Sequence, residues 1–172
     1  MKTLKRLTAL ALVGAMALSL AACGSSKKKV TVKEFKKILG KADFEVEESE
    51  DEDAEECWDA KYVEDDSGVE IVYYLFESKG TAKACFNTSY DDLNEELDED
   101  LFDGEVEKKS WYFTADGEFD KDSEILPGDE RYIVCVVAEE TLLVCYATPD
   151  KSAKKVLKNA LSDLGYEIEW SF

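Results

Sequence analysis

Apolar side chains recur at helical spacing in three parts of the chain, which is the pattern of one face of an amphipathic helix. The expected helices run from Thr31 to about Ala42, from near Ser78 to about Leu97, and from Thr148 to Gly165. The first opens with a capping box, in which the Thr31 oxygen and the Glu34 carboxylate satisfy free backbone N–H groups, and Gly40 can end it early. The third is expected to have Thr148 as its cap and Pro149 in its first turn.

Continuous apolar runs and alternating patterns predict the strands of a sheet. The clearest strands are residues 69–76, 131–138 and 141–147, of which the last two are expected to form a hairpin about Glu139-Glu140. These two are apolar on both faces, which is typical of central strands that are covered on both sides. Weaker strands are expected at 44–46, 60–63 and 110–114. The period of two in residues 166–172 indicates an edge strand.

Together these elements predict an α+β fold, with an antiparallel sheet of five to seven strands and three helices packed on it. Apolar residues make up 45% of the chain, which is enough for a buried core. A shift of 71 residues lays Ala82-Lys83 on Ala153-Lys154 and aligns the strand before each helix. These matches indicate a sheet built from two related β-β-β-α halves. The alternative is that they reflect only the sequence patterns that all helices and strands share. We expect residues 31–172 to form a single acidic domain.

The chain begins with a charged, an apolar and a small-residue segment in that order, which is the pattern of a secretory signal. The apolar run, residues 7–20, has 14 residues. It is too short for a membrane-spanning helix, which needs roughly 20. At its end, Leu20-Ala21-Ala22-Cys23 resembles the lipobox of bacterial lipoproteins. The resemblance implies that residues 1–22 are a signal peptide removed by cleavage, and that the sulfur of Cys23 carries a diacylglycerol.

Residues 23–30 are then the lipidated cysteine and a short tether of Gly, Ser and Lys. Glycine and serine make it flexible, and Lys27, Lys28 and Lys29 lie where anionic lipid headgroups are expected. A plain solubilising linker is the alternative. The resemblance implies an extracytoplasmic protein, held by lipid on the outer face of the cytoplasmic membrane. The short tether and the acidic bias are also similar to those of small surface lipoproteins of Gram-positive bacteria.

The charge of the chain is strongly negative. It has 21 basic and 40 acidic residues, and without residues 1–22 it has 18 basic residues and a net charge of −22. This excess argues against nucleic acid as a partner, because phosphate contacts need clustered Lys and Arg. It favours a basic protein, a basic peptide or a cation, with the tether toward the membrane and the acidic body away from it.

The acidic residues cluster at 47–56 and 91–103. We interpret these clusters as a solvated loop and an acidic helix end, and calcium binding is the alternative. Residues 120–124 have the alternating acids that open a calcium loop, but Ile125 stands where glycine is needed and Arg131 where glutamate is needed. We therefore predict no metal site.

Candidate catalytic chemistry is sparse. The chain has no histidine, which removes Ser-His-Asp and Cys-His catalysis and the usual zinc sites. It also lacks the common nucleophile and phosphate-loop motifs. We expect no catalytic residues and no cofactor. Aromatic residues at 111–113, 170 and 172 either stack on the sugar rings of a wall glycan or pack in the core and at its edge.

Four cysteines remain besides Cys23, at positions 57, 85, 135 and 145. An even number in an exported protein favours disulfides. Cys135 and Cys145 lie on neighbouring expected strands. A two-residue turn places them on opposite faces of the sheet, whereas a three-residue turn places them opposite each other. Buried free thiols and a Cys135–Cys145 disulfide are therefore both open.

These observations favour a lipid-anchored, non-catalytic binding or interaction module. The alternatives are an accessory structural component of an envelope complex and a carboxylate-based hydrolase, which needs only two acids at a defined separation.

Overall fold

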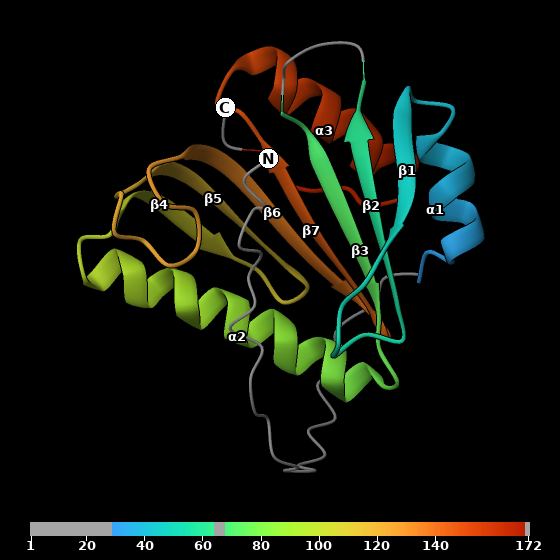
Figure 1. The fold of residues 1–172 in the computed structure, drawn as a ribbon, viewed down its shortest axis with the longest axis horizontal. Coiled ribbons are helices and arrows are strands. Elements are labelled where there is room, and N and C mark those ends of the chain that lie inside the picture. Colours follow the sequence, from blue (N-terminus) through green and yellow to red (C-terminus); the bar gives the residue numbers. More distant parts are fainter. Residues whose placement is uncertain (1–28, 64–67, 171–172) are drawn as a thin grey trace.

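The chain forms an α+β fold, as expected, in a computed structural model that describes residues 29–63 and 68–170 (Figure 1). The expected signal peptide, Cys23 and the first part of the tether lie outside the described residues. The sheet has seven antiparallel strands in the order β1-β2-β3-β7-β6-β5-β4. The strands are β1 (Phe44–Ser49), β2 (Glu56–Tyr62), β3 (Glu70–Leu75), β4 (Phe102–Lys108), β5 (Tyr112–Phe119), β6 (Glu130–Ala138) and β7 (Thr141–Ala147).

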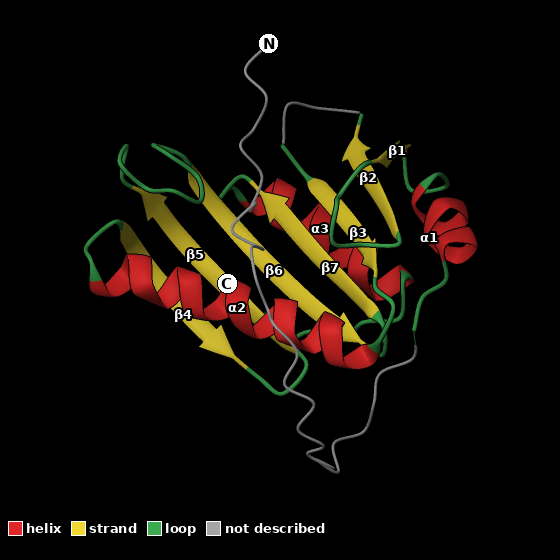
Figure 2. Ribbon diagram, turned by 60° about the horizontal axis from the view of Figure 1, so that its bottom comes forward, coloured by secondary structure: helices red, strands yellow, loops and turns green. Residues whose placement is uncertain are grey.

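Helices cover both faces of this sheet (Figure 2). They are α1 (Val32–Leu39), α2 (Lys79–Asp98) and α3 (Lys151–Asp163). The predicted capping box of α1 is confirmed, since the Glu34 amide donates to the Thr31 hydroxyl and the Thr31 amide donates to the Glu34 carboxylate. The predicted end at Gly40 is also confirmed.

The predicted cap of α3 is wrong by two residues. Asp150 is the N-cap, and its carboxylate accepts hydrogen bonds from the amides of Ser152 at 2.9 Å and Ala153 at 3.0 Å. Thr148 instead donates its hydroxyl proton to Asp150. Pro149 therefore precedes the helix. The cause is that a carboxylate with two amide partners satisfies more of the free N–H groups than a single hydroxyl does.

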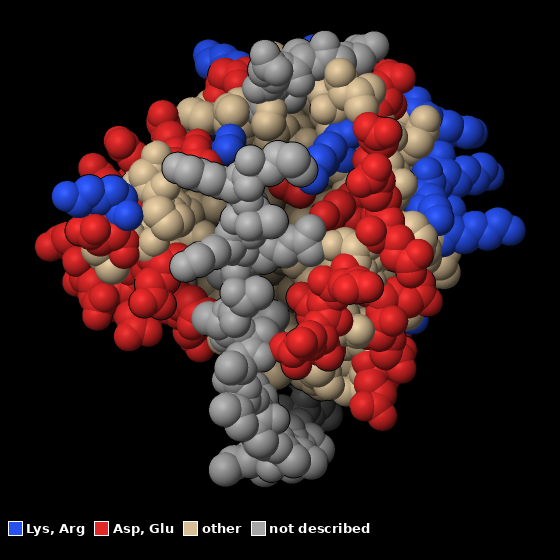
Figure 3. Space-filling model, in the orientation of Figure 1, with Lys and Arg blue, Asp and Glu red and all other residues tan. Residues whose placement is uncertain are grey.

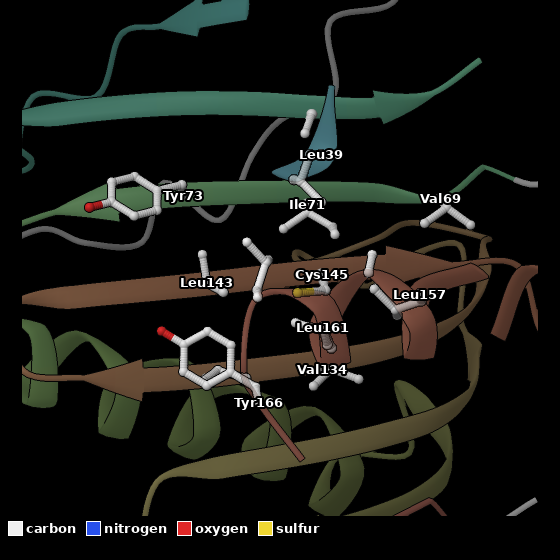
Figure 4. Close-up of a cluster of buried hydrophobic side chains, with 14 of the residues drawn as sticks. Leu39, Val69, Ile71, Tyr73, Val134, Leu143, Cys145, Leu157, Leu161 and Tyr166 are labelled. Atoms are coloured by element: carbon white, nitrogen blue, oxygen red, sulfur yellow. The ribbon is translucent and has the colours of Figure 1, made fainter. Parts of the chain in front are cut away.

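The larger core lies between the sheet and the pair α1 and α3 (Figure 4). Leu39, Leu157 and Leu161 come from the two helices, and Ile71 and Cys145 come from the central strands that face them. All five side chains are fully buried. The second core, on the opposite face, lies between the sheet and α2. Strands β6 and β7 contribute to both cores, which confirms their prediction as central, covered strands.

The predicted edge strand at residues 166–172 is wrong. No strand forms at 166–170, and positions 171–172 lie outside the described residues. Tyr166 and Ile168 are buried against the core of α1 and α3, and the Glu169 amide donates to the Tyr112 hydroxyl at 3.3 Å. The alternation therefore reflects a segment that lies across the sheet with one side buried, because such a segment buries every second side chain without pairing with a strand.

Strand β4 was not predicted, because Asp103 and Gly104 are poor strand formers. It pairs with β5, where Gly104 lies opposite Gly117. A β-carbon on Gly117 would lie 2.3 Å from the Asp103 carbonyl oxygen. The ring of Phe102 lies over both glycines and also contacts Phe119, with ring centroids 4.6 Å apart. Because the two glycines have no side chain, the Phe102 ring can pack over them, and this contact stabilises a strand that its sequence does not predict.

The order β-β-β-α occurs twice, as β1-β2-β3-α2 and β5-β6-β7-α3. The aligned residues Ala82 and Ala153 are both fully buried. The two helices nevertheless cover opposite faces of the sheet. The correspondence therefore extends to chain order and helix pattern, but not to the side of the sheet.

Candidate functional site

The described chain enters the domain beside the turn between β6 and β7. The Lys29 ammonium lies 3.1 Å from the Glu140 carboxylate. Val30 is buried, and its carbonyl oxygen accepts a hydrogen bond from the Tyr73 hydroxyl at 3.1 Å. Lys79, at the start of α2, lies 3.2 Å from the other turn residue, Glu139. We call five of these residues the anchoring end: Lys29, Val30, Lys79, Glu139 and Glu140.

Electrostatics keep this contact in place. The hydrogen bond from Lys29 lowers the pKa of the Glu140 carboxyl below its usual range. Burial raises the pKa of the Tyr73 phenol, so the phenol stays neutral and remains a hydrogen-bond donor. The start of the domain is thus fixed by one ion pair and one buried hydrogen bond.

The acidic clusters lie at the two opposite edges of the sheet. One comprises β1 and its connection to β2, and the other comprises the C-terminal half of α2 and β4. Together we call them the acidic edges. Their exposed acids are Glu45, Glu47, Glu48, Glu50, Glu52, Asp53, Glu55, Glu56, Asp91, Glu95, Asp98, Glu99, Asp100, Asp103, Glu105 and Glu107. Figure 3 shows acidic side chains over both regions.

The first cluster is more ordered than a solvated loop, because β1 and β2 include its two ends. Each cluster includes an edge strand, β1 or β4, where charge prevents pairing with the edge of another sheet. On α2, acidic side chains lie close enough to affect one another. Burial and the nearby charges of Glu95, Asp91 and Glu96 raise the pKa of the Asp92 carboxyl. Ionisation of Asp92 is therefore less favourable than that of a free aspartate, and a cation nearby makes it more favourable.

Glu96 is a buried carboxylate that sequence reasoning did not single out. It accepts hydrogen bonds from the Ser123 hydroxyl at 2.6 Å and from the amides of Glu124 at 2.8 Å and Ile125 at 3.1 Å. The carboxylate thereby fastens residues 123–125 to α2. The signal was its place between Leu93 and Leu97 on the buried side of the helix.

Lys154 is the buried cation, and it too was missed. Its ammonium lies 2.5 Å from the Asp116 carboxylate and 4.8 Å from the centre of the Tyr132 ring. Burial, followed by the charge of Asp116, raises the pKa of Tyr132, which therefore stays neutral. The group ties α3 to β5 and β6. Its sequence signal was a lysine directly beside the buried Ala153.

The four cysteines of the described residues, at positions 57, 85, 135 and 145, are free and buried, and they include no Cys135–Cys145 disulfide. The turn has two residues, so Cys135 lies opposite Val144 and Cys145 lies opposite Val134. The two sulfurs therefore lie on opposite faces of the sheet. Burial raises the pKa of both thiols, which keeps them protonated and unreactive.

Four of the five aromatic residues considered for sugar stacking pack within the protein, and the fifth, Phe172, lies outside the described residues. Tyr112 and Phe113 are buried. Trp111 lies against Tyr112, with ring centroids 4.6 Å apart, and Trp170 lies 5.6 Å from Tyr132. Core and edge packing thus accounts for these four aromatic side chains.

Within residues 29–63 and 68–170, no group of three or more acidic, cysteine or histidine side chains is placed to hold a metal ion. None of the helices in the described part of the chain has the length and hydrophobicity that a membrane span requires. Comparison of the chain with known protein families, curated proteins and solved structures gives no match.

Proposed function

We propose that the protein is a lipid-anchored lipoprotein on the outer face of the cytoplasmic membrane, where it acts as a non-catalytic binding module. Its partner is a basic protein, a basic peptide or a cation. The observation that carries the proposal is the lipobox at Leu20–Cys23, followed by a short tether into a domain with a large excess of acidic residues.

The geometry of the anchoring end supports this arrangement. Lys29 follows Cys23 by six residues, which span at most about 20 Å when fully extended. A lipid on Cys23 thus holds the turn between β6 and β7 within that distance of the membrane. Two acyl chains supply the stable attachment that one chain does not.

The acidic edges support a cationic partner. Their charges are exposed, and on α2 burial together with the neighbouring acidic charges raises the pKa of Asp92. At physiological ionic strength this attraction extends about 8 Å, so a partner must come close to the surface to gain from it. Binding through these charges is fast to form and sensitive to salt.

A salt titration tests the partner class. A ten-residue oligolysine peptide is titrated into the purified lipidated protein in detergent, and Kd is measured at low and high salt. We expect Kd to rise roughly tenfold or more as salt rises from about 50 to about 500 mM. A Kd that does not change with salt contradicts recognition through charge.

A pair of matched variants locates the site. The first replaces Asp91, Glu95 and Asp98 with their amides, and the second does the same at Glu45, Glu47 and Glu50. Both remove three exposed charges. We expect the α2 variant to weaken oligolysine binding more, because Asp91 and Glu95 act on Asp92 as well as on the peptide. Equal weakening points to the net charge alone, and no weakening in either variant overturns the proposed surface.

A further inference from the structure

The sign of the charge differs between the two helical layers. Helices α1 and α3, on one face of the sheet, together contain seven lysines and two acidic residues. Helix α2, on the opposite face, contains two lysines and five acidic residues. Of the 18 basic residues that remain after cleavage, seven thus lie in the two helices on one face of the sheet.

All but one of the lysines on α1 and α3 point to solvent. Buried residues such as Phe35 on α1 and Leu157 on α3 turn the opposite sides of the two helices outward. Lys154 alone is buried, while the other six lysines, with Lys41 just after α1, are exposed. We call these seven the basic helix surface: Lys33, Lys36, Lys37, Lys41, Lys151, Lys155 and Lys158. Helix α1 packs beside α3, and Figure 3 shows basic side chains gathered at the edge where Figure 1 places α1.

Much of this charge is not neutralised by the protein. Within the described chain, Lys33, Lys37 and Lys155 have no ion-pair partner. Lys36 lies over the Trp58 ring, 3.7 Å from its centre, which leaves its charge without an acidic partner there. The basic helix surface therefore presents positive charge to whatever lies opposite it.

We infer that the basic helix surface lies against the anionic lipid headgroups of the membrane, so that α2 faces away from the bilayer. This inference rests on the proposed lipid anchor. Helix α1 begins two residues after Val30, so it is the first element that the tether brings to the membrane. Attraction to the headgroups is short-ranged, and only a surface held close to them gains from it.

A membrane fits these observations better than a soluble anionic partner. A free acidic protein or nucleic acid is repelled by the net negative charge of the whole domain before it reaches the lysines. The membrane is already close to these lysines, because the lipid on Cys23 holds the protein to it. Two further lysines, Lys27 and Lys28, lie between Cys23 and Lys29 in the sequence. The acidic edges remain accessible to a cationic partner in this orientation.

The test uses lipidated protein reconstituted into two kinds of vesicle, one of phosphatidylcholine alone and one with about 30 mol% phosphatidylglycerol. A short pulse of a membrane-impermeant acylating reagent is followed by mass spectrometry of each lysine. We expect the lysines of the basic helix surface to react at least threefold more slowly on the anionic vesicles. The exposed control lysines Lys61, Lys83 and Lys121 should react equally on both. About 0.5 M salt should abolish the difference.

Matched variants separate this surface from general charge. In K33Q/K37Q/K155Q we expect the remaining lysines of the surface to lose their protection, with an unchanged circular dichroism spectrum. In K61Q/K83Q/K121Q protection should persist. Equal loss in both variants overturns the inference.

The outcomes also distinguish this inference from the proposed function. Flotation with neutral vesicles tests the anchor alone, because those vesicles carry no net charge. A protein that does not float defeats both claims. A protein that floats but shows equal acylation on the two vesicles overturns only the orientation. Protection by added single-stranded DNA, without any on anionic vesicles, assigns the surface to a soluble polyanion instead.

Discussion

Glu96 gives the sharpest test of how the fold is held together. Its carboxylate accepts three hydrogen bonds from residues 123–125. Replacement by alanine leaves these three donors without the carboxylate, in a place where water has little access. A hydrogen bond to a charged group contributes about 1.5–3 kcal/mol, and a buried unsatisfied donor costs about 1–3 kcal/mol. Since the contributions overlap and water can enter, we expect Glu96→Ala to reduce the free energy of unfolding by about 3–5 kcal/mol.

The assay is urea unfolding followed by circular dichroism, with Glu95→Ala as the control. Glu95 lies next to Glu96 on α2, carries the same charge and is exposed, so its replacement should change stability by less than about 0.5 kcal/mol. Hydrogen exchange adds a local readout. The amides of Glu124 and Ile125 should exchange faster in Glu96→Ala and not in Glu95→Ala. If the two variants unfold at the same urea concentration and exchange alike, Glu96 does not hold this segment.

Three further predictions concern stability, pH and thiols. Gly117→Ala should lower the unfolding free energy by about 1–3 kcal/mol, because the new β-carbon meets backbone atoms. The control Gly80→Ala, in α2, should leave stability unchanged or raise it by up to about 1 kcal/mol. Thermal unfolding of the two variants measures both effects. Asp92→Asn should raise the melting temperature at pH 7. The folded-state pKa of Asp92 is raised, so its ionisation opposes folding above that pKa, and the rise in melting temperature should vanish near pH 3. The control Asp91→Asn should raise the melting temperature less. Equal rises in the two variants contradict the assignment. The native protein should not react with a thiol reagent, and the unfolded lipidated protein should show four thiols; a fifth means that Cys23 is unmodified.

Helices and central strands could be predicted from the sequence because their burial follows one period. The capping box at Thr31, the end of α1 at Gly40 and the hairpin about Glu139-Glu140 are local, and each is confirmed. The register of that turn then determined the faces of Cys135 and Cys145, although the sequence left both turn lengths open. The predicted cap of α3 failed locally, because Asp150 and not Thr148 accepts the free amides. The predicted C-terminal strand failed because its burial depends on distant partners. Residues 166–170 alternate like a strand but lie across the sheet.

The charged features were harder to predict for the same reason. Glu96 and Lys154 look like surface residues until their partners, more than twenty positions away, are known. The segregation of lysines onto one face needs the positions of α1 and α3 relative to the sheet. Net charge and acidic clusters could be read directly, but the sequence did not show that both clusters lie on sheet edges.

The lipid on Cys23 is the claim on which the account depends most. Mass spectrometry of the N-terminal peptide, taken from membranes of cells that make the full chain, tests it directly. The account predicts a peptide that begins at Cys23 and carries a diacylglycerol thioether, and a Cys23→Ala variant that is not found in lipidated form. Recovery from the cytosol of an unmodified peptide that still contains residues 1–22 contradicts it.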